Sequence, residues 1–297
     1  MVKLLDDQLI AQAALGDIGA LKKLDRHGLF PAPGENALEF TERLGKLQSA
    51  LQSLDNDLKK GVVEVAPGIK LSEKYRIPPQ ISSEALETTG KLYNVRPDWV
   101  PGFFADESFG LLWGGCALSD PASGLVLFII RKIFRSKRRF LVYDRRELMA
   151  HEMIHAAHQS IDQLKYEEYF AYRSAKSLLR RTFGGCFVQK YDAMCFLLPI
   201  LLLPVMQFLN VMKVVDLPMW IFYLLAAVYP VFLVLRCGSS VVTAARARAF
   251  LEKSGAKQPD AVLFRMTAEE IKALSRKKMP AGDDLRWQII VQYLKGE

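Results

Sequence analysis

Three of the four histidines in this 297-residue chain lie in one short stretch, HEMIHAAH, at residues 151–158. His151 and His155 are four residues apart, so on an α-helix they share a face and can point at a single tetrahedral ion. Glu152 lies about 100° further round such a helix, where it can contact a water on that ion. This spacing predicts a zinc site that activates water. The alternative is a hydrogen-bonded helix without a metal.

The helix that must carry these residues has its own signals. Asp144 is followed three residues later by Glu147, a pattern typical of a capping box, so we expect a helix that begins at Arg145. The residues around the histidines are uncharged, which predicts that the helix is buried; they are Met149, Ala150, Met153, Ile154, Ala156 and Ala157. Two imidazoles and a carboxylate in such a place need partners that offset their desolvation, and zinc supplies them.

A catalytic zinc site needs a third protein ligand and one open position. Position 161, where a metzincin has its third histidine, is Ile161. His158 lies about 4.5 Å beyond His155 along the helix axis, so we expect it to cap the helix or to contact a ligand. A second helical stretch, residues 162–181, follows a short break. Both Glu167 and Glu168 in its first turn are close enough to fold back to the metal.

The stretch HEMIH followed by EYFAYR, which begins at Glu168, resembles the gluzincin class of zincin metallopeptidases. It looks most like the membrane-bound CAAX prenyl proteases and the bacterial membrane heat-shock zinc proteases, over about thirty residues. The resemblance implies that His151, His155 and Glu168 bind Zn2+ and that Glu152 is the general base. Tyr172 stands where many gluzincins have Asp. Tyr172, Arg173 and His158 are expected to stabilise the oxyanion or to contact the ligands.

Two apolar runs follow this stretch. Residues 193–212 and 217–235 contain no charged residue, and each is about long enough to cross a bilayer. The connection KVVD is short, so the runs predict an antiparallel transmembrane hairpin; the alternative is a buried core hairpin. Basic residues flank the entry and the exit, which places both soluble parts in the cytoplasm. They are Arg180, Arg181, Lys190, Arg236, Arg246, Arg248 and Lys253.

The net charge of +8 is concentrated in a few places. The basic turn Arg131–Arg139 lacks interleaved aromatic residues that would stack bases, so we predict contact with anionic lipid and no nucleic-acid partner. A solvated loop is the alternative. Four cysteines without CxxC spacing indicate a reducing compartment, and Asp6 and Asp7 argue against a cleaved secretion signal.

The remaining elements are expected to support the site. The first sixty residues predict two helices, the second with a leucine stripe that packs on a neighbour: Leu44, Leu47, Leu51, Leu54 and Leu58. One helix is expected near SSEALETTGKLYNV. GLVLFIIRKIF and RFLVYD predict a hairpin. The segment GLVLFIIR is either the sheet edge that binds an extended substrate or a core strand. Cys116 is either inert packing or an inhibitory thiolate ligand.

Together these patterns predict an α+β, mostly helical protein: a zincin-like catalytic domain with a small β-hairpin or sheet, and a two-helix transmembrane hairpin. The expected divisions are 1–75, 76–190, 191–237 and 238–297. The leading hypothesis is a membrane-anchored, cytoplasm-facing zinc endopeptidase that hydrolyses proteins or peptides at or in the membrane. The alternative is a non-catalytic membrane adaptor, in which the histidine helix holds a structural metal or none and the leucine helix binds a partner.

Overall fold

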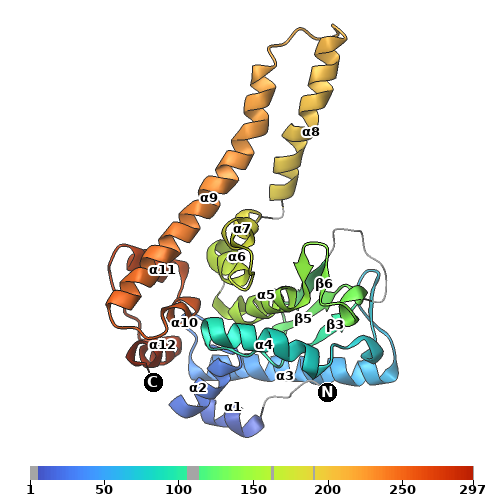
Figure 1. The fold of residues 1–297 in the computed structure, drawn as a ribbon. Helices are drawn as coiled ribbons and strands as arrows, with labels where there is room; N and C mark the ends of the chain where they lie inside the picture. Colours follow the sequence, from blue (N-terminus) through green and yellow to red (C-terminus); the bar gives the residue numbers. More distant parts are fainter. Residues whose placement is uncertain (1–5, 106–113, 162–163, 190, 297) are drawn as a thin grey trace.

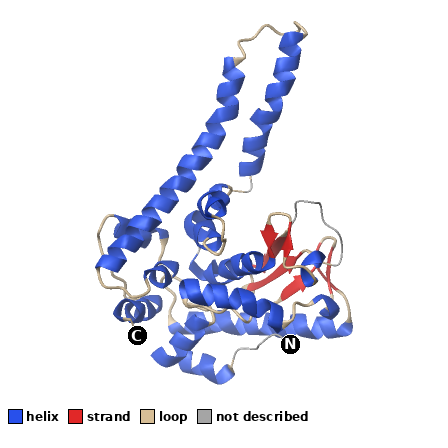
Figure 2. Ribbon diagram, in the orientation of Figure 1, coloured by secondary structure: helices blue, strands red, loops and turns tan. Residues whose placement is uncertain are grey.

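The computed structural model describes residues 6–105, 114–161, 164–189 and 191–296. A helix-rich body with a small sheet carries two long helices that project away from it (Figures 1 and 2). The N-terminal part comprises α1 (Asp7–Ala14), α2 (Ile18–Arg26), α3 (Ala37–Lys60) and α4 (Pro79–Tyr93). The central part comprises α5 (Arg145–His158), α6 (Leu164–Tyr172) and α7 (Leu178–Phe183). The C-terminal part comprises α8 (Asp192–Val211), α9 (Trp220–Lys253), α10 (Pro259–Phe264), α11 (Ala268–Ser275) and α12 (Leu285–Lys295).

The N-terminal helices follow their sequence signals with one difference. The leucine stripe of α3 is buried throughout, as predicted, and Asn36 and Glu39 form a capping box at its start. The segment before α3 holds two helices where one was expected. Gly16, at a φ of +76°, ends the first, and the Asp17 side chain caps the second. The helix expected near SSEALETTGKLYNV is α4.

The main sheet has the strand order β3-β5-β4. Strand β5 (Leu125–Ile130) pairs in parallel with β3 (Gly102–Phe104) and antiparallel with β4 (Gly115–Asp120). The predicted hairpin between GLVLFIIRKIF and RFLVYD is therefore wrong, because both edges of β5 are already occupied. Residues Lys132–Arg135 form a 3-10 helix instead, and β6 (Arg139–Phe140) and β7 (Tyr143–Asp144) pair separately. A second small hairpin joins β1 (Val63–Ala66) and β2 (Ile69–Leu71).

The central position of β5 also corrects the idea that GLVLFIIR is a sheet edge. Residues 126–130 are all buried, as an uninterrupted apolar run requires when both faces of a strand are covered. The alternative reading, a core strand, is confirmed. Strand β4 is at the edge of this sheet, and it contacts α5.

Helix α5 lies at the centre of the body, between α4, β5 and α6 (Figure 1). Its uncharged residues are buried as predicted, so the histidine stretch is part of the main hydrophobic core. The last three helices contact α9, α2 or one another and complete that core. Helix α9 runs without a break across residue 237, so the expected division there falls inside one helix.

Helices α8 and α9 are long and apolar enough to span a membrane. Their most apolar 18-residue windows have mean hydropathies of 2.1 and 1.9, and only 0% and 11% of those windows are buried. A core hairpin of a soluble protein would be covered on most sides, so that alternative is wrong. The two helices pack against each other and otherwise expose leucine, valine and phenylalanine side chains.

Candidate metal centre

Helix α5 begins where the sequence predicted, at Arg145, with Asp144 as its N-cap. The Asp144 carboxylate accepts a hydrogen bond from the backbone N–H of Arg146 at 3.0 Å. Glu147 reaches a different partner from the one a capping box requires. Its carboxylate accepts the backbone N–H of Lys176 at 3.1 Å and pairs with Arg180 at 2.9 Å. Glu147 thus ties the start of α5 to the segment that follows α6, which fixes the two helices relative to each other.

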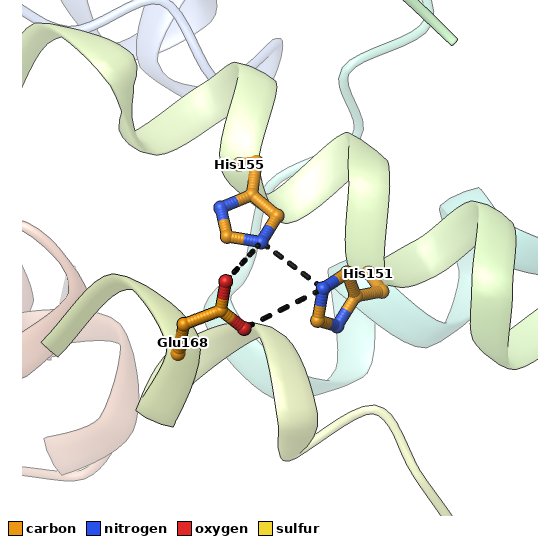
Figure 3. Close-up of side chains that lie close together, drawn as sticks. All are labelled: His151, His155 and Glu168. Carbon is orange, nitrogen blue, oxygen red and sulfur yellow. Dashed lines mark hydrogen bonds and ion pairs between the residues drawn. The ribbon is translucent and has the colours of Figure 1, made fainter. Parts of the chain in front are cut away.

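His151, His155 and Glu168 come together between α5 and α6, and their ligand atoms all lie within 4.8 Å of one another. Figure 3 shows the three side chains pointing at a common centre, the histidines from α5 and the glutamate from α6. The two Nε2 atoms are 3.1 Å apart. Glu168 oxygens lie 3.7 Å from His151 Nε2 and 3.6 Å from His155 Nε2. This group can hold a metal ion.

The other nitrogen of each imidazole is already engaged. His155 Nδ1 lies 2.7 Å from Glu167 Oε1, and His151 hydrogen-bonds the backbone carbonyl of Ala171. Since a carboxylate accepts, His155 Nδ1 carries a proton, and its Nε2 is the ring nitrogen that faces His151 and Glu168. The two Nε2 atoms and the Glu168 carboxylate therefore face one centre. Such an arrangement of acceptors is stabilised by a cation, and the Glu167 contact is the kind that orients a metal-binding histidine.

The separations fit a small tetrahedral ion. Ligand atoms held about 2.0–2.1 Å from zinc at the tetrahedral angle lie about 3.3 Å apart. The observed 3.1, 3.6 and 3.7 Å bracket that value. One carboxylate and two imidazoles are also a donor set that zinc uses in catalytic sites, where a fourth position stays open for water.

Burial and mutual contacts set the protonation of the group. Burial, and then the charge of His155, lowers the pKa of His151 to about 3, which keeps that ring neutral. Burial would also lower the pKa of His155, but the hydrogen bond to Glu167 and nearby carboxylates raise it. Burial alone would raise the pKa of Glu167, but the His155 hydrogen bond lowers it. The pKa of Glu168 is raised, chiefly by burial.

Glu152 follows His151 on α5 and does not belong to the group that can hold a metal ion. Its side chain is 8% exposed, and burial raises its pKa to about 7, with opposing smaller effects of His155 and Glu168. A carboxyl group of this kind can both accept and return a proton near neutral pH. Its charge interacts with those of His155 and Glu168.

The other predicted site residues have different places. Tyr172 packs its ring against His151, with ring centroids 4.6 Å apart, and burial raises the pKa of its hydroxyl to about 12. Arg173 turns away, donating to the Tyr169 hydroxyl at 3.2 Å and to Asp260 at 3.2 Å. The structure brings Tyr172 to the site but directs Arg173 toward α10.

His158 has a core environment. It is 2% exposed, and its ring packs against those of Phe170 and Phe264, with centroids 5.2 and 4.9 Å away. Burial lowers its pKa to about 4, so it is neutral at physiological pH. Within the described residues it belongs to no metal group, and aromatic packing accounts for its position.

Two contacts at this site were not anticipated. Sequence reasoning considered Glu167 only as an alternative ligand, whereas the structure makes it the hydrogen-bond partner of His155. Arg180 on α7 was assigned to the membrane flank, yet it pairs with Glu147 and its charge reaches His151. Cys116 on β4 lies near Glu152, but burial and that carboxylate raise its thiol pKa, which disfavours a thiolate ligand.

Comparisons with protein families, with characterised proteins and with solved structures found no match to this chain. What can be said of its chemistry therefore comes from its own residues: a half-buried His–His–Glu group that can hold a metal ion, and two helices that are long and apolar enough to span a membrane.

Proposed function

We propose that this protein is a membrane-anchored zinc endopeptidase. The observation that carries the proposal is the convergence of His151 Nε2, His155 Nε2 and the Glu168 carboxylate on one centre, with Glu152 next to it. Three protein ligands leave the fourth coordination position of zinc for water, which is typical of a catalytic and not of a closed structural site. Glu152, next to His151 in the sequence, supplies the additional carboxylate. The likeness of the HEMIH stretch to gluzincins supports the same reading.

In the proposed reaction each residue has a defined task. Zinc bound by His151, His155 and Glu168 would supply the Lewis acidity that activates a water and polarises the scissile carbonyl. Glu152 accepts the water proton and passes it to the leaving amine. Glu167 holds His155 in the tautomer whose Nε2 is free to bind. Tyr172, packed on His151, is our proposed hydrogen-bond donor to the oxyanion.

The surroundings of the site favour substrates at the membrane. The tip between β6 and β7 exposes Leu141 and Val142 at 58% and 72%, and α7 exposes Leu178 and Leu179 at 78% and 70%. The two segments are neighbours, since Arg180 of α7 donates to the Val142 carbonyl at 3.4 Å. Large exposed apolar side chains of this kind mark contact surfaces. We propose that they meet the bilayer that α8 and α9 cross, with the body on the cytoplasmic side.

The test of proteolysis is the variant Glu152→Gln. It should keep the metal and the fold but lose the general base, so cleavage should slow by about 10²- to 10⁴-fold. The measurement compares new N-termini in membranes that contain wild type, Glu152→Gln or the matched control Glu269→Gln, an exposed residue of α11. Identical termini in all three samples, with equal expression, would reject hydrolysis and favour the adaptor.

Membrane topology is tested separately. Side-specific reporters on the N-terminus, on the C-terminus and in the 213–216 turn should place both ends in the cytoplasm and the turn on the opposite side. If the two ends report different compartments, one of the helices does not span the membrane and the proposed hairpin is wrong, whatever the outcome for proteolysis.

A further inference from the structure

A cavity lies at the foot of the α8–α9 pair. It has a volume of about 260 Å³ and is lined by residues of α6, α7, the segment that leads to α8, and α9. Three of its lining residues are cations: Lys165, Arg181 and Arg236. Valine and tyrosine side chains complete part of the wall, so the cavity combines positive charge with apolar surface. The proposed peptidase reaction uses none of these residues.

The three cations differ in how they are held. Arg236 is fixed: it pairs with Asp192 at the start of α8 and donates to the Cys186 carbonyl at 2.7 Å. Lys165 and Arg181 are exposed, and the described part of the chain provides no carboxylate partner for either. Lys165 instead lies over the Tyr166 ring at 5.3 Å. Two cations that open on a cavity without an internal anion leave room for an anionic ligand.

The location of the cavity limits what that ligand can be. Arg236 directly follows the uncharged stretch of α9, and Asp192 directly precedes that of α8. The Asp192–Arg236 pair therefore marks the end of the apolar surface on both helices. At the edge of a bilayer that level is occupied by lipid headgroups, whose phosphates attract lysine and arginine. The apolar wall residues Val188, Val241 and Tyr169 would contact the glycerol and the first methylenes of a lipid.

We propose that this cavity binds the phosphate of an anionic phospholipid headgroup, held by Lys165 and Arg181 beside the Arg236–Asp192 pair. The inference rests on the proposed insertion of α8 and α9, and not on the proposed hydrolysis. The site also adjoins the metal centre: Lys165 is on the same helix as Glu168. A Cβ added to Gly185, another lining residue, would lie 3.1 Å from the Glu168 Cβ. A bound headgroup would thus anchor α6 at the membrane surface.

The experiment is native mass spectrometry of the full chain purified in detergent, titrated with dioctanoyl phosphatidylglycerol, dioctanoyl phosphatidylcholine or inorganic phosphate. Wild type should bind phosphatidylglycerol more tightly than the zwitterionic lipid. The variant Lys165→Gln/Arg181→Gln should bind phosphatidylglycerol at least about 10-fold more weakly, since each cation near a lipid surface contributes measurably. The control Arg276→Gln/Lys278→Gln removes the same charge from exposed positions at the end of α11 and should bind as wild type does.

A second variant, Val241→Trp, fills the cavity without changing its charge and should also weaken binding. This variant tests the proposal if the double variant folds poorly. Equal affinity of wild type and both cavity variants would overturn the proposal, as would equal affinity for the two lipids. If inorganic phosphate binds with the same dependence on Lys165 and Arg181 while phosphatidylglycerol does not, the ligand is a soluble phosphate and the lipid proposal is wrong. Alkaline extraction of each membrane sample checks insertion of α8–α9 independently.

Discussion

Two clusters of interacting polar side chains in this protein differ in burial and in how their donors and acceptors match. In the first, Arg265 is fully buried, and its guanidinium donates twice to Asp25 at 2.7 Å, to the Tyr93 and Ala261 carbonyls, and to the Tyr293 hydroxyl. The Tyr293 hydroxyl in turn donates to Asp25 at 2.7 Å. All five guanidinium N–H groups have a partner, so the cluster is complete within the protein.

In the second cluster, the Nε2 atoms of His151 and His155 and the Glu168 carboxylate face one another. The donors of both rings point outward, to the Ala171 carbonyl and to Glu167, and no cationic side chain in the described residues completes the centre. The comparison teaches that burial and charge alone do not identify a functional site. What distinguishes this one is that two imidazole nitrogens and a carboxylate converge on one point, where they can hold a metal ion.

Breaking the closed cluster should give the largest effect on stability. Arg265→Met removes the only cation bonded to Asp25 among the described residues and leaves a buried carboxylate, which should cost about 3–5 kcal/mol of unfolding free energy. The double variant Asp25→Leu/Arg265→Met removes both charges and should recover much of that loss. Thermal unfolding in detergent measures both. A single variant as stable as wild type would show that the cluster is not structural.

Removing the metal should lower stability through the His151–His155–Glu168 cluster and leave the Arg265 cluster unaffected. With free zinc at 1,000 times its dissociation constant, binding should stabilise the wild type by about 4 kcal/mol, and a chelator should abolish that gain. His155→Ala should melt at the same temperature with and without zinc. His27→Ala changes a histidine that pairs with Asp98 outside the site, and it should keep the zinc-dependent shift. One zinc per chain in His155→Ala, measured by mass spectrometry, would contradict the assigned ligands.

His158 should make the free energy of unfolding depend on pH, and it should not affect metal binding. Burial lowers the folded-state pKa of His158 to about 4. Glu167 raises this pKa slightly, and His155 lowers it slightly. The unfolded chain therefore binds more protons between pH 6.5 and about 4, so stability should fall as pH falls through that window. The loss is at most about 1.4 kcal/mol per pH unit. His158→Gln should flatten the curve measured in chelator; an unchanged slope would mean that His158 does not titrate as its packing implies.

The smallest effect should come from Glu167, whose contact orients a ligand without touching the metal. Glu167→Gln should weaken zinc affinity by about 10- to 100-fold while one zinc per chain is still bound at saturation. Glu168→Gln removes a proposed ligand and should weaken binding further. Competition with a fluorescent chelator gives both affinities. If Glu167→Gln has the larger effect, the two adjacent glutamates have exchanged roles and the third ligand must be reassigned.

The sequence by itself determined those features that depend on nearby residues. Helix α5 starts at Arg145 because Asp144 caps it, and its 3.6-residue period places His151 and His155 on one face. The leucine stripe of α3 and the apolar stretches of α8 and α9 are equally local patterns, so they were predicted correctly. The resemblance to gluzincins favoured Glu168 as the third member of the group, and the structure places it there.

The tertiary structure decided which surfaces meet, because that depends on residues far apart in the chain. The rotation of α6 against α5 turns Glu168 toward the metal centre and leaves Glu167 beside His155, although the two glutamates are neighbours in sequence. Asp260 draws Arg173 away from the site. Strand β5 pairs with β3 and β4 and not with β6, the strand that follows it. Side-chain contacts across the paired strands stabilise the sheet. Local signals fix where elements begin and which faces are apolar; only packing decides what each face contacts.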